Sequence, residues 1–256
     1  MSIHPTAIIH KDAKIGPGVQ VGPFSIINAD VEIGARCIIG SHVWLDHARV
    51  GEGTKIGAQT LIGGDPQMLR WSDVPSLVRI GKNNDIRELV TIHRSRNENG
   101  ETALGDGNFI MSNTHIGHDC LIGNNTIITT YAGLSGSVTV HDFAIIGGQA
   151  GVHQFVRIGE MAMVGGMARI VQDVAPFMLA EGSPADMRST NAVGLKRKGF
   201  SDKARANIKE AFKILFKSGL SLKSSRLKLA EMPDDSGEMK KILDFVNSTT
   251  RGLTGV

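Results

Sequence analysis

The sequence predicts a parallel β-helix of hexapeptide repeats followed by a small α-helical domain. Three observations support this prediction: an Ile, Val or Leu stands at every sixth position over most of the chain, a Gly or small polar residue often follows it, and a helical period replaces the six-residue period after Pro176. A helix repeats its apolar face near 3.6 residues and a half-buried strand every second residue, so neither explains a period of six. We therefore assign residues 1–176 to the β-helix, and residues 177–256 to a linker and helical domain.

The six-residue period starts at the beginning of the chain. It runs from Ile3 to Leu45, slips by one residue to Val50 and continues to Ile62. A short run from Ile80 to Ile92 follows. Twelve repeats then follow without a break, at Leu104, Ile110, Ile116, Ile122, Ile128, Leu134, Val140, Ile146, Val152, Ile158, Val164 and Ile170. Each hexapeptide forms one short side and three complete a triangular coil, so one coil takes about 18 residues.

The residues around each aliphatic position fit such a coil. Gly follows it in Ile15-Gly16, Ile116-Gly117 and Ile158-Gly159, as expected at a corner that a Cβ would obstruct. Small residues such as Ser25 and Ala144 often stand three positions further on. The aliphatic side chains are expected to point inward and stack from coil to coil, so that each coil contacts only its neighbours.

Two interruptions of the period predict loops that leave the scaffold. The first covers about residues 63–78 and contains Asp65-Pro66-Gln67-Met68-Leu69-Arg70-Trp71, and the second covers residues 95–103 and is polar. Loops on a rigid scaffold often carry function. The alternative is that they only contact a neighbouring subunit.

After Pro176 the pattern becomes helical. Ser201-Asp202 can cap a helix whose apolar residues recur at helical spacing up to Phe216, and Gly219 is a plausible stop. A second helix is expected over about 222–232, followed by Pro233, and a third starting at Asp234 or Asp235. These helices could cover the last coil of the β-helix.

Composition narrows the range of functions. The chain has 256 residues, 41% hydrophobic but only 5% aromatic, which fits a core of stacked aliphatic side chains. The formal net charge of +3 excludes a strongly polybasic nucleic-acid binder but allows a local basic patch. Its two cysteines, Cys37 and Cys120, favour a reducing cytoplasm over a disulfide framework. We find no signal peptide or membrane-spanning stretch, so we expect no stable membrane insertion.

The coil length also places several polar residues on one edge. Eighteen residues after His118 comes Gly136, and eighteen more lead to Gln154, beside His153. Because adjacent strands lie about 4.8 Å apart, these residues should form a column. An imidazole can accept a proton near neutral pH and a carboxylate can orient it, so His118 and Asp119 are a candidate base pair.

Two alternatives remain open for these histidines. His118 and Asp119 are adjacent in sequence and could be ordinary polar residues on the surface of a coil. Otherwise His115, His118 and His153 could bind zinc, which in trimeric solenoids takes ligands from two subunits.

Several segments in this order resemble one family over essentially the whole chain. They are His115-Ile-Gly-His118-Asp119-Cys120, Phe143 to Phe155, Gln172 to Pro176, Asn191 to Phe200 and Ser248 to Leu253. The chain is similar to the acyl carrier protein:UDP-N-acetylglucosamine O-acyltransferases. The resemblance implies a left-handed β-helix and a homotrimer with active sites between subunits. It also implies transfer of a (R)-3-hydroxyacyl group from acyl carrier protein to the glucosamine 3-position of the UDP-sugar, the first step of lipid A synthesis, without a metal or cofactor.

The resemblance also implies roles for individual residues. His118 would be the general base, Asp119 would orient it, and the Gly136 N–H would bind the oxyanion. The positions matching the substrate-binding residues of the family are Met68, Arg70, His115, Ser137, His153, Gln154, Gly166, Asn191, Arg197 and Lys198. Gly166 matches the position that limits acyl length, and the basic run 196–198 could also steer an acidic carrier protein. That run could equally be a solvated basic turn.

Three departures from the family concern the acceptor sugar. Many relatives have an aspartate at Met68, a histidine at Ser137 and an acidic residue at Val193. Some relatives that lack the aspartate use a 3-amino sugar and form an amide, so this acceptor is the nearest alternative. The acyl length and the choice between hydroxyl and amine stay open.

The sequence leaves two other classes of function open. A zinc hydratase of the γ-carbonic-anhydrase type shares the solenoid and the trimer but leaves the segment from Asn191 to Phe200 and the helices unexplained. A non-catalytic binding solenoid is the other alternative, for which substituting His118 would have no effect.

Overall fold

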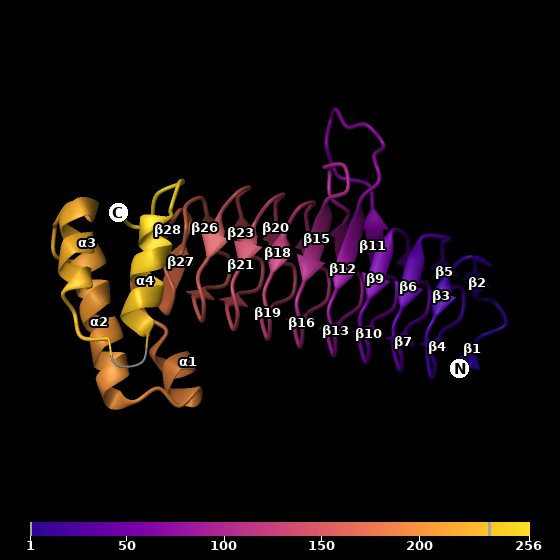
Figure 1. Ribbon diagram of the computed structural model, residues 1–256, viewed down its shortest axis with the longest axis horizontal. Helices are drawn as coiled ribbons and strands as arrows, with labels where there is room; N and C mark the ends of the chain where they lie inside the picture. Colours follow the sequence, from indigo (N-terminus) through magenta and orange to yellow (C-terminus); the bar gives the residue numbers. More distant parts are fainter. Residues whose placement is uncertain (1, 235–236) are drawn as a thin grey trace.

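The protein is a long left-handed parallel β-helix with a helical domain at one end (Figure 1). The computed structural model describes residues 2–234 and 237–256. Three sheets form the three sides of the coil, and within the β-helix all strands pair in parallel. The predicted fold class is therefore confirmed.

Each sheet takes its name here from its first strand. The β1 sheet contains β1 (Ser2–Ile3), β4 (Gln20–Val21), β7 (Ile38–Ile39), β10 (Lys55–Ile56), β13 (Asp85–Ile86), β16 (Phe109–Ile110), β19 (Ile127–Ile128), β22 (Ile145–Ile146), β25 (Met163–Val164), β27 (Met178–Gly182) and β28 (Ala185–Thr190). The β2 sheet contains β2 (Ile8–Ile9), β5 (Ile26–Ile27), β8 (Trp44–Leu45), β11 (Leu61–Gly64), β14 (Thr91–His93), β17 (His115–Ile116), β20 (Gly133–Leu134), β23 (Gly151–Val152) and β26 (Arg169–Ile170). The β3 sheet contains β3 (Lys14–Ile15), β6 (Val31–Ile33), β9 (Ala48–Val50), β12 (Leu77–Ile80), β15 (Glu101–Leu104), β18 (Leu121–Ile122), β21 (Thr139–Val140) and β24 (Arg157–Ile158).

The registers show that the regular coil takes 18 residues. Ile116 pairs with Leu134, and Leu134 pairs with Val152. The slip after Leu45 shortens one coil by a residue, so that Ile33 pairs with Val50. The aliphatic residue of almost every repeat points inward and is buried, which gives one continuous core.

The glycine after the aliphatic residue is needed for close approach between coils. A Cβ on Gly117 would lie 2.8 Å from the backbone nitrogen of Gly136 in the next coil. The left-handed backbone conformation falls two residues later instead, at non-glycine residues such as Asp119 (φ 60°) and Ser137 (φ 60°). Spacing between coils, and not an unusual φ, therefore explains the glycine.

Two loops leave the corner between the β2 and β3 sheets and project from the scaffold (Figure 1). β11 ends at Gly64 and β12 begins at Leu77, while β14 ends at His93 and β15 begins at Glu101. We call residues 65–76 the long loop and residues 94–100 the short loop. The loops contact each other, because Asn99 N–H donates to Pro75 O (2.6 Å) and Ser76 Oγ donates to Ser95 O (2.6 Å).

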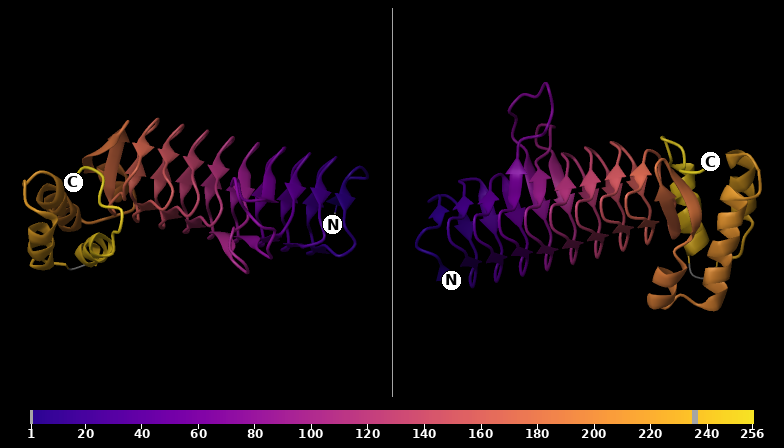
Figure 2. Two further views of the ribbon diagram at one scale, coloured as in Figure 1. Left: turned by 90° about the horizontal axis from the view of Figure 1, so that it is seen from above. Right: turned by 180° about the vertical axis from the view of Figure 1, so that it is seen from behind.

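The end of the β-helix contains two features that the sequence analysis did not predict. β27 extends the β1 sheet in parallel, and β28 then returns antiparallel to it. A short helix, α1 (Ala192–Arg197), follows, with Asn191 Oδ1 accepting from Gly194 N–H at its N-terminus. The longer helices lie beyond the last coil in all views (Figures 1 and 2).

The predicted longer helices are present. α2 (Asp202–Phe216) is capped by the Ser201 side chain, as predicted, and α3 (Leu222–Ala230) follows Gly219. α4 (Glu238–Asn247) begins later than predicted, because the Asp234 carboxylate accepts from Met239 and Lys240 N–H in its first turn. Asp235 lies outside the described residues. None of the helices in the described ranges is long and apolar enough to cross a membrane.

Candidate active site

The predicted column of polar residues lies at the corner where the β2 sheet turns into the β3 sheet. Each residue of the column follows a buried aliphatic residue of β17, β20 or β23 by two positions. Ser137 N–H donates to His118 O (2.8 Å), and Phe155 N–H donates to Gly136 O (3.2 Å). The 18-residue spacing therefore places His118, Gly136 and Gln154 in successive coils.

His118 and Asp119 form a hydrogen-bonded pair. His118 Nδ1 lies 2.6 Å from Asp119 Oδ2, and only 7% of His118 is exposed. The left-handed φ of Asp119 turns its side chain back toward the imidazole, so the adjacent residues do not diverge. Because an ionised carboxylate only accepts, Nδ1 donates this hydrogen bond, and in the neutral form of the imidazole Nε2 then holds the lone pair.

Gly136 lies against the imidazole of His118. A Cβ at this position would lie 2.5 Å from His118 Nε2, so only glycine fits beside the ring. Within the described residues the Gly136 N–H donates no hydrogen bond, although the residue is buried. An unused N–H beside a basic nitrogen is the arrangement that an oxyanion site needs.

The short loop holds the far side of Asp119. Ser95 Oγ donates to Asp119 Oδ1, and Asn97 Nδ2 donates to the same oxygen (2.9 Å). Arg96 adds a longer contact, with Nε 3.7 Å from Oδ2. The sequence analysis did not identify these residues, because the short loop has no six-residue period from which the directions of its side chains can be predicted.

Two further histidines lie beside this pair and stay neutral. Burial, with smaller contributions from His93 and His118, lowers the pKa of His115 to about 4. Burial also lowers the pKa of His93, whose Nδ1 donates to Asp65 O (2.6 Å). His93 Nε2 is buried without a hydrogen-bond partner, and its ring centroid lies 5.2 Å from that of His115. Sequence reasoning did not assign His93 to the site, although its coil follows the long loop directly.

A groove continues from this cluster along the β2 sheet. It has a volume of about 400 Å³, and its lining includes His115, His153, Gly133 and Gly151. A Cβ on either glycine would meet nothing within 4 Å, so the floor is open. His153 Nδ1 lies 3.3 Å from Arg251 of the C-terminal tail and 3.2 Å from Gln154 O.

The structure does not bring the remaining predicted site residues to this edge. Asn191, Arg197 and Lys198 belong to α1 and its ends, on the side of the molecule opposite the projecting loops (Figure 2). There Asn191 Nδ2 donates to Met161 O, and Lys198 Nζ lies 3.6 Å above the Phe143 ring centre. Met68 and Arg70 lie in the long loop, and Gly166 lies at the corner between the β1 and β2 sheets. One chain therefore brings together the candidate base and the candidate oxyanion donor, but only part of the predicted substrate-binding residues.

The histidines do not gather as a metal site. Over residues 2–234 and 237–256, no group of three His, Cys, Asp or Glu side chains is placed to hold a metal ion. A separate cavity of about 560 Å³ lies between the two loops and His47, away from His118.

Comparison with known proteins agrees with this geometry. The family model described as UDP N-acetylglucosamine O-acyltransferase, domain 2, matches residues 173–254, and the bacterial transferase hexapeptide model matches residues 101–136. A third model, the GMPPB C-terminal domain, matches residues 3–97. An acyl-acyl-carrier-protein–UDP-N-acetylglucosamine O-acyltransferase of Thermodesulfovibrio yellowstonii is 44% identical, over 98% of both chains. The chain belongs to the UDP-N-acetylglucosamine O-acyltransferase family. The protein of the same name from Paraburkholderia phymatum is also 44% identical over 98% of both chains.

Solved structures of the UDP-N-acetylglucosamine O-acyltransferase family share the entire fold. The enzyme from Moraxella catarrhalis superposes with a TM-score of 0.96 at 36% identity, covering 99% of this chain and 100% of its own. The Arabidopsis enzyme gives a TM-score of 0.86 at 31% identity, covering 98% and 99% of the two chains. Both the β-helix and the C-terminal helices are therefore features of this acyltransferase family.

Proposed function

We propose that this protein transfers a (R)-3-hydroxyacyl group from acyl carrier protein to the glucosamine 3-hydroxyl of UDP-N-acetylglucosamine, the first step of lipid A synthesis. Relatives named for acyl transfer to this sugar nucleotide match it over almost the whole chain. The single observation that carries the proposal is the position of the His118–Asp119 pair beside the unused N–H of Gly136. Acyl transfer requires a base and an oxyanion donor side by side.

The geometry supports a direct transfer. With Nδ1 held by Asp119, His118 Nε2 removes the proton from the sugar 3-hydroxyl as its oxygen attacks the thioester carbonyl carbon. The carbonyl oxygen becomes an oxyanion and accepts from Gly136 N–H. When the intermediate collapses, the carbon–sulfur bond breaks and the His118 imidazolium returns the proton to the departing thiolate. The products are the sugar ester and the free carrier thiol.

We propose a homotrimer whose active sites lie between adjacent subunits. The outward residues of the β1 sheet support this assembly, because Phe109, Ile127, Ile145 and Met163 form a half-buried apolar row along four successive coils. An apolar row of this kind favours a protein partner. A neighbouring copy could bring Asn191, Arg197 and Lys198 to the sugar nucleotide, which one chain alone does not do.

The acyl chain is proposed to run along the corner that carries Gly148 and Gly166. A Cβ on Gly166 would meet only Gly148 O, at 3.4 Å, so the two glycines leave this corner open. Glycine at both positions favours a long acyl chain. Lys196, Arg197 and Lys198 supply positive charge for docking of an acidic carrier protein, which we place with the enzyme in the cytoplasm.

The choice of acceptor concerns three positions at which this chain departs from the family pattern, Met68, Ser137 and Val193. Met68 is 37% exposed in the long loop and offers a thioether where many relatives have a carboxylate. Val193 is exposed and Ser137 follows the oxyanion residue. A sugar with an amine at the 3-position remains the alternative acceptor, and the test below includes it.

The test supplies purified protein with 3-hydroxyacyl carrier proteins of several chain lengths. Each is incubated with UDP-N-acetylglucosamine or with its 3-amino analogue, and products are identified by mass spectrometry. We expect an ester on the first sugar and a loss of at least about 10²-fold in kcat for His118→Ala. Amide formation alone would support the alternative acceptor, and no transfer to either sugar would overturn the proposal.

A further inference from the structure

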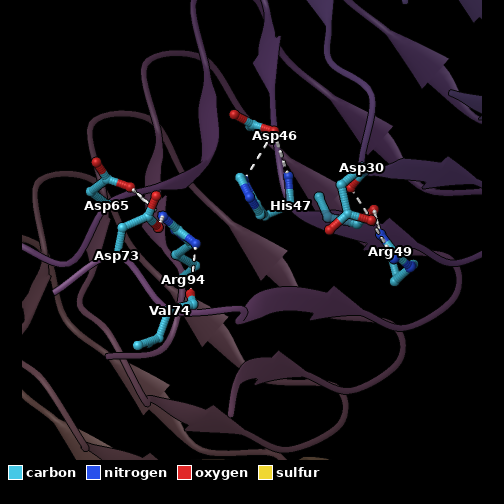
Figure 3. Close-up of polar contacts among 9 residues, drawn as sticks. Asp30, Asp46, His47, Arg49, Asp65, Asp73, Val74 and Arg94 are labelled. Atoms are coloured by element: carbon cyan, nitrogen blue, oxygen red, sulfur yellow. Dashed lines mark hydrogen bonds and ion pairs between the residues drawn. The ribbon is translucent and has the colours of Figure 1, made fainter. Parts of the chain in front are cut away.

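The short loop connects the long loop to the candidate base. Its first residue, Arg94, is almost fully buried and donates to Asp65, Asp73 and the Val74 carbonyl of the long loop (Figure 3). Its next residues, Ser95 and Asn97, point the other way, toward Asp119. The short loop is thus fixed on one side and presents hydrogen-bond donors on the other.

Ser95 is held in one orientation. It is fully buried, its carbonyl accepts from Ser76 Oγ, and its hydroxyl oxygen accepts from Asn97 N–H (3.0 Å). Because that oxygen already accepts a hydrogen bond, its proton is free to donate to Asp119 Oδ1. The Thr102 hydroxyl also accepts from Asp119 N–H (2.7 Å), which fixes the backbone of the aspartate.

The two oxygens of Asp119 have different partners. Oδ1 accepts from both Ser95 Oγ and Asn97 Nδ2, whereas Oδ2 accepts from His118 Nδ1 and, at the longer distance of 3.5 Å, from the Arg96 N–H. Hydrogen bonds to an ionised group are the stronger kind, so the two donors on Oδ1 fix the carboxylate plane. With that plane fixed, Oδ2 can hold the imidazole in only one orientation.

We propose that Ser95 and Asn97 are positioning residues for acyl transfer, which set the direction and basicity of His118 through Asp119. The inference rests on the proposed function, because it assumes that His118 is the base. Neither residue borders the groove that contains His115 and His153, so their effect should fall on kcat and not on KM.

The pH dependence follows from the charges around the pair. Arg96 faces Asp119 from the short loop, while His115 on β17 and His93 on β14 face His118, and the Cys120 thiol lies next to Asp119. His93 and His115 are neutral near pH 7, so the charges that act on the His118 imidazole are mainly those of Asp119 and Arg96. If the Ser95 or Asn97 donor is removed, less of the negative charge on the Asp119 carboxylate is neutralised. The carboxylate then stabilises the protonated form of His118 more strongly. The acid limb of the rate profile should therefore move to higher pH.

The experiment measures kcat, KM and the pH profile of acyl transfer for Ser95→Ala, Asn97→Ala and Asn97→Asp. We expect kcat to fall roughly tenfold for each alanine variant, with KM within about twofold of the wild-type value. Asn97→Asp places a second carboxylate beside Asp119 Oδ1 and should move the acid limb furthest, by about one pH unit. Ser95 is buried, so Ser95→Ala can also lower stability. Asn97 is exposed, so its two variants test the role with the smaller risk of misfolding.

Two controls separate positioning from a general disturbance of the loop. Glu98→Ala changes an exposed neighbour that has no hydrogen bond or ion pair within the described part of the chain, and should leave kcat and the profile unchanged. In an Asp119→Ala background, Asn97→Ala should have no further effect, since its route to His118 is gone.

The outcomes distinguish this inference from the proposed function. If the wild-type enzyme transfers the acyl group and His118→Ala does not, but both alanine variants keep the wild-type kcat and pH profile, the positioning role is wrong and the function stands. An equal loss in the presence and absence of Asp119 would also overturn the role. Failure of His118→Ala to lower kcat would overturn the proposed function itself.

Discussion

His115 shows how a residue on the edge of the β-helix becomes a neutral polar group. It stands one position before the core residue Ile116, and Thr91 Oγ1 from the preceding coil lies 2.9 Å from its Nδ1. Burial lowers its pKa to about 4, from an ordinary value near 6.5. At pH 7 His115 is therefore neutral and adds no charge beside His118.

This shift predicts a pH dependence of stability. Between about pH 4 and pH 6.5 the unfolded chain binds a proton at His115 that the folded protein does not, so stability falls as the pH is lowered through this window. The contribution can reach about 1.4 kcal/mol per pH unit. We expect His115→Gln to show a weaker loss of unfolding free energy between pH 6.5 and pH 4.5 than the wild type, in denaturant titrations at one protein concentration. Parallel curves for the two proteins would contradict the assignment.

At this scale the sequence predicted part of the site. Regular coils of 18 residues were enough to place Gly136 beside His118, because no insertion separates β17 from β20. Ser95 and Asn97 were not predictable, because the short loop has no period and its side-chain directions depend on tertiary contacts. The short loop lengthens the coil between β14 and β17, where Thr91 pairs with His115, so the 18-residue spacing did not connect His93 with His115.

The long and short loops act as one element. The Arg94 guanidinium donates four hydrogen bonds, two to Asp65 and one each to Asp73 and Val74, and lies 4.8 Å above the Trp71 ring centre. The carboxylates of Asp65 and Asp73 are mostly exposed, while Arg94 is buried. The arginine therefore anchors the long loop to the scaffold. The long loop carries Met68 and Arg70 at its exposed end.

Removing this anchor should release the long loop. In Arg94→Met the two aspartates lose their buried partner, and trypsin should cut after Arg70 severalfold faster, because the loop opens more often. The measurement is the rate of appearance of the two fragments by mass spectrometry. Arg87→Met is the control, since the Arg87 side chain forms an exposed ion pair with Glu88 and should leave cleavage at Arg70 unchanged. Equal rates in the two variants would show that Arg94 does not hold the loop.

The elements at the end of the β-helix differ in how well the sequence predicts them. α2 was predictable from its apolar spacing and its Ser201 cap, both local signals. The hairpin of β27 and β28 was not, because its short strands lack the six-residue period and its pairing with β25 depends on the end of the β-helix. α1 has only six residues, too few to show a helical period.

On the scale of the whole molecule, one buried carboxylate joins the helical domain to the β-helix. Asp173 is 1% exposed and accepts from Arg157 Nε (3.1 Å) and Thr249 Oγ1 (2.8 Å). Arg157 also donates to Phe245 O of α4 (3.0 Å). The last coil, the helix and the C-terminal tail therefore meet at this carboxylate.

Neutralising this carboxylate should weaken the junction. Asp173→Asn leaves Arg157 without its charged partner, and we expect a loss of about 2 kcal/mol in unfolding free energy, which is less than for a fully buried pair because Arg157 is partly exposed. Circular dichroism during denaturant unfolding would measure it. Glu32→Gln, which removes the partly exposed carboxylate that pairs with Lys14 and Arg49 on the surface, is the control and should change stability little. If both variants unfold at the same denaturant concentration, Asp173 does not hold the junction.

The two ends of the β-helix differ in how well they are covered. At the C-terminal end the hairpin, the helices and the tail close the last coil, whereas at the other end Ile9 and Ile15 are only half-buried and Ile3 is exposed. Because coils support only their neighbours, local opening should begin at the first coil and advance one coil at a time. The column with His118 lies many coils from that end. The first coils can therefore open at elevated temperature while the column with His118 stays folded.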